Sequence, residues 1–210
     1  MLTLYYAPGS CALATHIALF DAGAPFETKR VDFGAGEQRR PDYLAVNPKA
    51  RVPALATEHG VLTETPALLA YVAQRFPAAK LAPIDDPFAF AQVQEFNSYL
   101  CSTAHVAHAH LRRGTRWVDA GETDAMEAMK RYVPTSVAKI FELIDSKMLK
   151  GPWVLGERYS ICDPYLYTLT RWLGDDGVDI NSLPKVREHR ARMIERDSVK
   201  RALAEQDIPA

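Results

Sequence analysis

Apolar residues at the start of the chain follow the strand period and then the helix period. They fall on every second position over 2–6, which predicts a strand, and recur at helical spacing over 13–20, which predicts a helix ending at Gly23. Further strands are expected over 26–33, 52–56 and 61–62, with a short helix over 43–46. The order is therefore β-α-β, a connector, and then two strands followed by a helix.

The helix that closes this part begins at Thr65-Pro66. We expect Thr65 to cap it and Pro66 to occupy its first position, where a missing N–H costs nothing. Three prolines, Pro77, Pro83 and Pro87, follow within a short stretch. They indicate a boundary, so we expect one domain over 1–78, a linker over 79–87 and a second domain over 88–210.

The second domain has helical patterns and no convincing strand. Long helical stretches are expected over 88–110 and 125–149, and shorter helices after Pro184 and Asp197. Ser160 and Asp163 are spaced like a capping box that opens a further helix, to which we assign a folding role.

Composition narrows the classes of protein that fit. The chain has 210 residues and a net charge of −1, so no strong field draws nucleic acid or anionic lipid. No apolar run approaches the ~20 residues of a membrane span, and the N-terminus lacks the pattern of a signal peptide. The three cysteines are odd in number and far apart, which favours a reducing, cytoplasmic location over a disulfide framework.

Cys11 stands where the first strand turns into the first helix. Free N–H groups and the positive end of the helix dipole collect there, so we expect a lowered thiol pKa and a reactive sulfur. The alternative is a buried, inert cysteine. Position 14 is Ala, so a Cys-x-x-Cys pair is absent and only a mixed disulfide between Cys11 and a small thiol stays open. We expect Cys101 and Cys162, within packed helices, to react slowly.

Four motifs in order resemble the cytosolic glutathione transferases, and in particular their bacterial beta class. They are Tyr6–Cys11, Asn47–Leu55, Leu62–Leu68 and Gly156–Asp163. The resemblance covers essentially the whole chain. It implies an α/β thioredoxin-like N-terminal domain, an all-α C-terminal domain, glutathione as cosubstrate and a homodimer.

The resemblance also implies the contacts of glutathione. Val52-Pro53 is expected to be a cis peptide, with Val52 offering its backbone N–H and C=O to the cosubstrate as an added strand would. Glu64 and Thr65 suit the ammonium and carboxylate of the γ-glutamyl end. Ser10 and Arg51 complete this part of the predicted site. The loop 34–36 lacks a lysine that some beta-class members use toward the glycine carboxylate, so Arg51 or Gln38 is a candidate for that role.

Ser98, Ser102 and His105 recur at helical spacing on one face of the helix over 88–110. Spacing alone equally fits an ordinary surface face. The resemblance favours His105 as an active-site residue that hydrogen-bonds a sulfur anion or a bound water, with Cys11 beside it. The family often has Asn where this chain has Ser98, which weakens that contact. No metal site is expected, because only His105 and His108 share a face.

The function implied is attack of the glutathione thiolate on a small apolar electrophile bound between the domains. One alternative is a glutathione-dependent thiol–disulfide oxidoreductase that uses Cys11 alone. Another is a non-catalytic carrier of hydrophobic ligands, although a carrier needs none of Cys11, Glu64 and His105. Detoxification, dehalogenation and redox repair all remain open as the physiological role.

Overall fold

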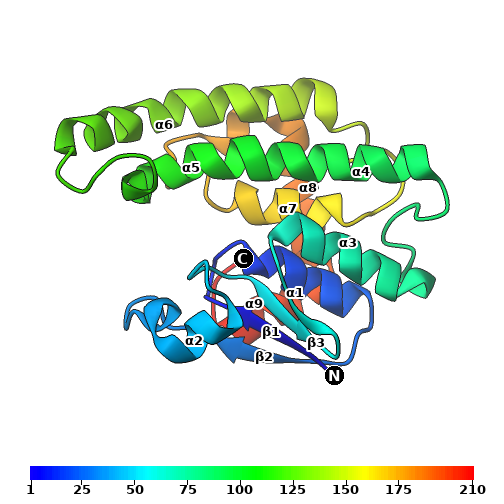
Figure 1. The fold of residues 1–210 in the computed structure, drawn as a ribbon. Coiled ribbons are helices and arrows are strands. Elements are labelled where there is room, and N and C mark those ends of the chain that lie inside the picture. The colour runs from blue at the N-terminus through cyan, green and yellow to red at the C-terminus, as the bar shows by residue number, and fades with distance from the viewer.

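A computed structural model describes residues 1–210, and its N-terminal part is built on a four-stranded sheet (Figure 1). The strands are β1 (Leu2–Tyr6), β2 (Phe26–Arg30), β3 (Ala54–Thr57) and β4 (Gly60–Thr63), in the order β2-β1-β3-β4. The β1–β2 pair is parallel, because a helix crosses between the two strands, and the other pairs are antiparallel.

Two long helices flank this sheet. Helix α1 (Ala12–Asp21) is buried along almost its whole length. It packs against the sheet and also against α3 (Thr65–Arg75), α7 (Cys162–Thr170) and α9 (Asp197–Gln206). Helix α3 (Thr65–Arg75) buries Leu68, Leu69 and Val72. The connector carries the short turn η1 (Glu37–Arg39) and helix α2 (Pro41–Val46).

The C-terminal part is a layer of helices above the sheet (Figure 1). Its first long rod joins α4 (Pro87–Tyr99), the π-helical segment η3 (Leu100–Ala104) and α5 (His105–Arg112). The second joins α6 (Thr123–Leu143) to the π-helical segment η5 (Ile144–Met148). The remaining elements are η2 (Pro77–Ala79), η4 (Gly114–Arg116), α7 (Cys162–Thr170), η6 (Ile180–Ser182), α8 (Pro184–Glu195) and α9 (Asp197–Gln206).

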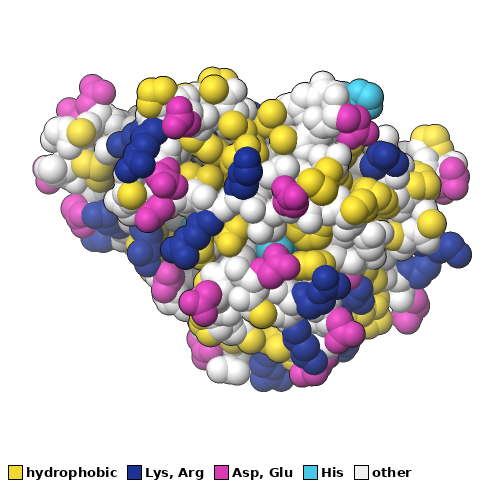
Figure 2. Space-filling view, turned by 90° about the horizontal axis from the view of Figure 1, so that it is seen from below, with side chains coloured by type: hydrophobic (Ala, Val, Ile, Leu, Met, Phe, Trp, Pro, Cys, Tyr) yellow, Lys and Arg dark blue, Asp and Glu magenta, His cyan; other side chains and the backbone are white.

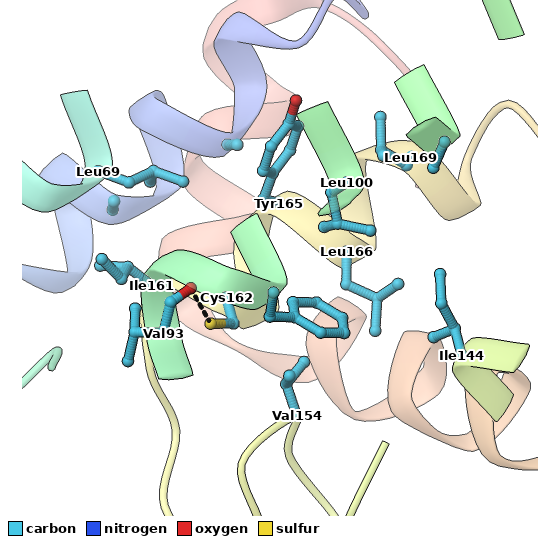
Figure 3. Close-up of a cluster of buried hydrophobic side chains, with 14 of the residues drawn as sticks. Leu69, Val93, Leu100, Ile144, Val154, Ile161, Cys162, Tyr165, Leu166 and Leu169 are labelled. Carbon is cyan, nitrogen blue, oxygen red and sulfur yellow. Dashed lines mark hydrogen bonds between the residues drawn. The ribbon is translucent and has the colours of Figure 1, made fainter. Parts of the chain in front are cut away.

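One core of 31 buried residues runs through both parts, so the two layers are packed as one body. It joins Leu4 of the sheet and Leu69 of α3 to Val93 of α4 and Leu166 of α7. Figure 3 shows Tyr165 at the edge of this cluster, with its hydroxyl pointing away from Cys162. None of the helices combines the length and hydrophobicity that crossing a membrane would require.

The predicted order of elements is present, with four local corrections. The strand expected over 26–33 ends at Arg30, and the one expected over 52–56 starts only at Ala54. Thr65 is not the cap of α3: it is the first helical residue, Glu64 precedes it with a φ of 74°, and no side chain caps the helix. The long helix expected over 88–110 is interrupted by the π-helical segment η3. Side chains after η3 therefore point in directions that differ from those of one continuous α-helix.

Asp163 is the most heavily bonded carboxylate of the core. Its side chain is fully buried and accepts hydrogen bonds from the backbone N–H groups of Val154 (2.8 Å) and Ser160 (2.7 Å). It also accepts from the Ser160 hydroxyl (3.2 Å) and pairs with His189 Nε2 (3.0 Å). The Ser160 hydroxyl in turn accepts from the N–H of Cys162, which closes the predicted capping box. Asp163 thus joins a loop, the start of α7 and helix α8.

Asp163→Ala should therefore lower the free energy of unfolding by roughly 3–5 kcal/mol, because several buried donors lose their acceptor at once. Urea unfolding followed by circular dichroism measures this. The control is Asp145→Ala, which removes one acceptor of a single backbone N–H, that of Val186, at a half-buried position. A loss at Asp163 no larger than that at Asp145, about 1 kcal/mol, would contradict the assigned role.

Candidate functional site

The loop between β1 and α1 is held by side chains of the helical part. The Gly9 N–H donates to Gln206 Oε1 at 3.1 Å, and the Gly9 carbonyl accepts from Trp172 Nε1 at 3.0 Å. Gly9 has a φ of 69°, a conformation that glycine adopts without strain. The donor and the acceptor of one residue, two positions before Cys11, are thus both fixed, by Trp172 in the turn after α7 and by Gln206 of α9.

Cys11 immediately precedes the first residue of α1, as predicted, but its thiol is buried. Its S–H donates to the Val52 carbonyl at 3.5 Å. Burial raises the pKa of Cys11 to about 11, although a hydrogen bond with Thr65 works in the opposite direction. The prediction of a lowered pKa is therefore wrong for the unliganded protein, because removal from water outweighs the favourable position at the helix start.

The backbone beside Cys11 is shaped by a cis peptide between Val52 and Pro53, as predicted. Two buried side chains fix the preceding carbonyl: Tyr43 Oη and Asn47 Nδ2 each donate to the Arg51 C=O at 2.6 Å. The N–H of Val52 donates to no backbone carbonyl. Val52 therefore presents an unused donor in an edge that a peptide-like ligand can extend.

Glu64 and Thr65 lie next to this edge, at the start of α3. Thr65 is buried and hydrogen-bonds to the Cys11 side chain. Glu64 is exposed, and its carboxylate pairs with Lys49 Nζ at 2.5 Å. Lys49 also donates to Thr63 Oγ1 at 2.6 Å. The pair places one negative and one positive group side by side near Cys11.

His105 approaches from the helical part, at the point where η3 ends and α5 begins. Its Nδ1 lies 3.3 Å from the hydroxyl of Tyr165, and its ring centroid is 5.2 Å from that of Trp172. His108 stacks on the same tryptophan at 4.3 Å and pairs with the buried Asp176 at 2.7 Å.

The burial of His105 and the basic residues near it determine its charge state. Burial lowers its pKa to about 4, and the neighbouring His108, Arg116 and Arg51 add to the effect. His105 is therefore a neutral imidazole at pH 7, able to donate a hydrogen bond without carrying a charge.

The serines that were predicted to bind glutathione are less clearly part of the candidate site. Ser98 and Ser102 are exposed, and the hydroxyl of Ser102 contacts only the hydroxyl of Thr103. The Ser10 hydroxyl donates to Ala7 C=O at 2.7 Å and accepts from the N–H of Ala12, so it shapes the turn into α1. Gln38 has a buried side-chain oxygen without a partner. No group of three or more His, Cys, Asp or Glu residues is arranged to hold a metal ion.

Several contributors were not predicted from the sequence, namely Lys49, Tyr165, Trp172 and Gln206. Only Lys49 carried a local signal, because it lies inside the Asn47–Leu55 motif. A hollow of about 670 Å³ also opens between the end of α1, β2 and α9. None of the predicted site residues lines it, so the residues around Cys11 remain the candidate site.

Comparisons with known proteins agree with this geometry. Residues 1–74 match the family described as "Glutathione S-transferase, N-terminal domain". The chain is 30% identical to the glutathione S-transferase GstA of Escherichia coli O157:H7, over 99% of this chain and 100% of that protein.

Solved structures are similar over the full length. A glutathione transferase homologue from Sulfitobacter, solved with bound glutathione, is 46% identical with a TM-score of 0.94, covering 100% of this chain and 99% of that one. A beta class glutathione S-transferase from Sphingomonas chungbukensis is 32% identical with a TM-score of 0.85, covering 99% and 100%. The predicted thioredoxin-like sheet domain with a helical C-terminal domain is thereby confirmed.

The thiols should react in an order set by their burial. Cys101 is half-buried, Cys11 is buried and Cys162 is fully buried, and burial raises the pKa of all three. In the unliganded protein we expect iodoacetamide to label Cys101 first and Cys162 last, which corrects the expectation that Cys101 is slow. The labelling rate of Cys11 should still be rising above pH 9, since only about one molecule in a thousand carries its thiolate at pH 8.

Mass spectrometry of digests resolves the three sites. The Cys101→Ser variant serves as the control, because it leaves Cys11 as the more accessible of the two remaining thiols. A Cys11 rate that levels off near pH 7 would show a lowered pKa and overturn this account.

Proposed function

This chain belongs to the glutathione S-transferase family, and we propose that its site joins the thiolate of glutathione to a small electrophile. The protein is a glutathione transferase, and glutathione is its cosubstrate. In the proposed reaction the sulfur attacks an electrophilic carbon and a C–S bond forms. In a substitution, the leaving group departs with the electron pair of the bond that breaks.

The free N–H of Val52 supports the proposed place of the peptide part of glutathione. Val52 precedes β3, which begins at Ala54, so its N–H and C=O lie outside the sheet pairing and can bind the cysteinyl unit of glutathione. The Val52 carbonyl already accepts from the Cys11 thiol, so the glutathione backbone would compete with this bond.

The two charged ends of glutathione would lie on either side. Glu64 would accept from the γ-glutamyl ammonium, and Thr65 with the first N–H groups of α3 would hold the neighbouring carboxylate. Lys49, already paired with Glu64, is suited to assist that carboxylate. Arg51 would bind the glycine carboxylate. Ser10, Ser98 and Ser102 stay predicted contacts.

The observation that best supports the proposal is that two neutral groups, the Cys11 thiol and the His105 imidazole, both lie close to Tyr165, where the sulfur of glutathione would be placed. The Cys11 thiol has a raised pKa and the His105 imidazole a lowered one, so neither brings a charge of its own. If the Tyr165 hydroxyl donates to His105 Nδ1, the ring proton resides on Nε2 and can be donated to the thiolate. Such donors stabilise the anion that glutathione supplies.

The same residues weigh against the two alternatives. An oxidoreductase that uses Cys11 needs its thiolate, which burial disfavours here. A carrier of hydrophobic ligands needs neither the neutral His105 nor the Glu64–Lys49 pair. The conjugating transferase therefore accounts for more of the site.

Four further assignments belong to the proposal. The protein would be a member of the beta class, in keeping with its 32% identity to the Sphingomonas enzyme. It would work in the cytoplasm as a homodimer. Its domains would span 1–78 and 88–210, with the linker at 79–87.

Two variants should separate binding from chemistry. Glu64→Ala should weaken glutathione binding by roughly 1.5–3 kcal/mol, because it removes the acceptor of an ammonium group.

His105→Ala should lower kcat about a hundredfold with little change in glutathione affinity, because its donor acts on the developing anion. Calorimetry gives the affinities, and conjugation of chlorodinitrobenzene gives the rates.

Cys11→Ala is the matched control for His105→Ala, since both side chains lie close to Tyr165 and would flank the sulfur in the proposed pose. It should retain much of the conjugation rate, because glutathione brings its own sulfur. Loss of all conjugation in Cys11→Ala, with His105→Ala unaffected, would favour the oxidoreductase alternative.

A further inference from the structure

A chain of hydrogen bonds runs from the protein surface to the turn before Cys11. Its outer end is Glu205 of α9, an exposed residue whose carboxylate lies 2.9 Å from Nε2 of His16. Nδ1 of His16 lies 3.1 Å from Nε2 of the Gln206 amide, and Oε1 of that amide accepts from the Gly9 N–H at 3.1 Å. The chain passes between α9 and α1, two helices that pack against each other (Figure 1).

The Gly9 N–H fixes the orientation and the proton of every group in this chain. A backbone amide can only donate, so it requires the oxygen of the Gln206 amide and turns the NH2 group toward His16. Nδ1 of His16 must therefore be an unprotonated acceptor. The ring proton resides on Nε2, where it donates to Glu205. The geometry thus fits one state of His16, the neutral ring with its proton on Nε2.

A second proton on His16 is incompatible with this arrangement. An imidazolium ring donates from both nitrogens, so Nδ1–H would face the NH2 group of Gln206. Rotation of the amide would bring its oxygen to Nδ1 but would leave its NH2 group against the Gly9 N–H. One oxygen cannot serve donors on two sides, and an unmatched buried donor is costly. Protonation of His16 and the hydrogen bond of the Gly9 N–H therefore exclude each other.

The surroundings of His16 favour the neutral ring. The side chain is fully buried among three aromatic rings, whose centroids lie 5.0–5.8 Å from its own, namely those of Tyr6, Phe20 and Phe26. Burial lowers the pKa of His16, the Glu205 carboxylate opposes this shift, and Arg201 adds to it. Both charged groups belong to α9, while β1 contributes the Tyr6 phenol. At pH 7 the ring is therefore neutral, as the Gly9 N–H requires.

The outer end of the chain is open to solvent. Glu205 and Arg201 line the hollow of about 670 Å³ beside β2, and the Arg201 guanidinium rests on the ring of Phe20 at 4.0 Å. Basic and acidic side chains are interspersed over the face in Figure 2, so distant charges there largely offset one another. The two charged groups of α9 are thus the ones that tune His16.

We propose that His16 is a positioning residue for glutathione. As a neutral acceptor it directs the Gln206 oxygen at Gly9 and so holds the turn that leads into Cys11, and on taking up a proton it releases that turn. This rests on the proposed function, because the turn borders the predicted glutathione site. Coupling between two binding events is reciprocal, so glutathione that needs the held turn also opposes proton uptake by His16.

The test follows glutathione affinity by calorimetry from pH 7 downward, over the range in which circular dichroism shows folded protein. The wild-type protein should lose affinity on the acid side of the usual histidine pKa, by up to about tenfold for each pH unit, because one proton is coupled to binding. Glu205→Gln keeps an acceptor for Nε2–H and removes the charge that raises the pKa of His16, so its loss should begin at a lower pH. Glu195→Gln, which removes an exposed carboxylate paired with Lys200, should follow the wild-type profile.

Two substitutions of His16 separate its role as an acceptor from its packing. In His16→Asn the Oδ1 atom replaces Nδ1 as the acceptor for Gln206 and cannot be protonated. The ratio of its affinity to that of the wild-type protein should therefore rise toward acid pH, and ionisations elsewhere cancel in this ratio. His16→Leu has no acceptor and should bind glutathione roughly three- to tenfold more weakly than His16→Asn at pH 7.

The other outcomes each decide a defined point. Superimposable pH profiles of the wild-type protein and Glu205→Gln would overturn the role of His16 and leave the proposed function intact, and this comparison holds even if a His16 variant fails to fold. Equal affinities of folded His16→Asn and His16→Leu would also overturn it, because the acceptor would then be irrelevant. Absence of glutathione binding by the wild-type protein at pH 7 would remove the proposed function, and the inference with it.

Discussion

The structure depends on the two hydrogen bonds that hold Gly9. Trp172, in the turn after α7, donates to its carbonyl, and Gln206 of α9 accepts from its N–H, so the turn that leads into Cys11 is fixed by residues far away in the sequence. Gln206 is itself oriented by a buried histidine: its amide contacts His16 Nδ1 at 3.1 Å, and His16 Nε2 lies 2.9 Å from Glu205. Burial lowers the pKa of His16, which leaves a neutral ring that can accept at Nδ1 and donate at Nε2. The amide oxygen of Gln206 is then directed at Gly9.

Removal from water gives the site its electrostatic character. Cys11 is buried and His105 is partly buried, and this raises the pKa of the thiol and lowers the pKa of the imidazole. A thiolate–imidazolium pair is therefore not the resting state. In the proposed reaction the charges enter with the ligand and are met by neutral donors beside its sulfur.

The sequence was sufficient for the order of elements and for the cis Val52-Pro53 bond, because apolar periodicity and short motifs encode both. It was insufficient for the pKa of Cys11. The helix start is a local feature visible in the sequence, but the burial that dominates depends on packing with segments distant in the chain, such as the one that carries Val52. Trp172 and Gln206 are missed for the same reason, since each lies more than 160 residues from Gly9. The π-helical η3 is another such case, because no residue pattern in 88–110 signals the wider turn that leads into His105.

Hydrogen exchange at the Gly9 amide tests the central claim most directly, namely that the C-terminal helix builds the catalytic turn. The measurement compares the wild-type protein with Gln206→Met, a variant that keeps the side-chain length and removes the amide. The account predicts a protected Gly9 amide in the wild-type protein and fast exchange in the variant, with the core amide of Leu4 equally slow in both. Equally fast exchange of Gly9 in the two proteins would show that the loop is not held from α9, and would contradict the account.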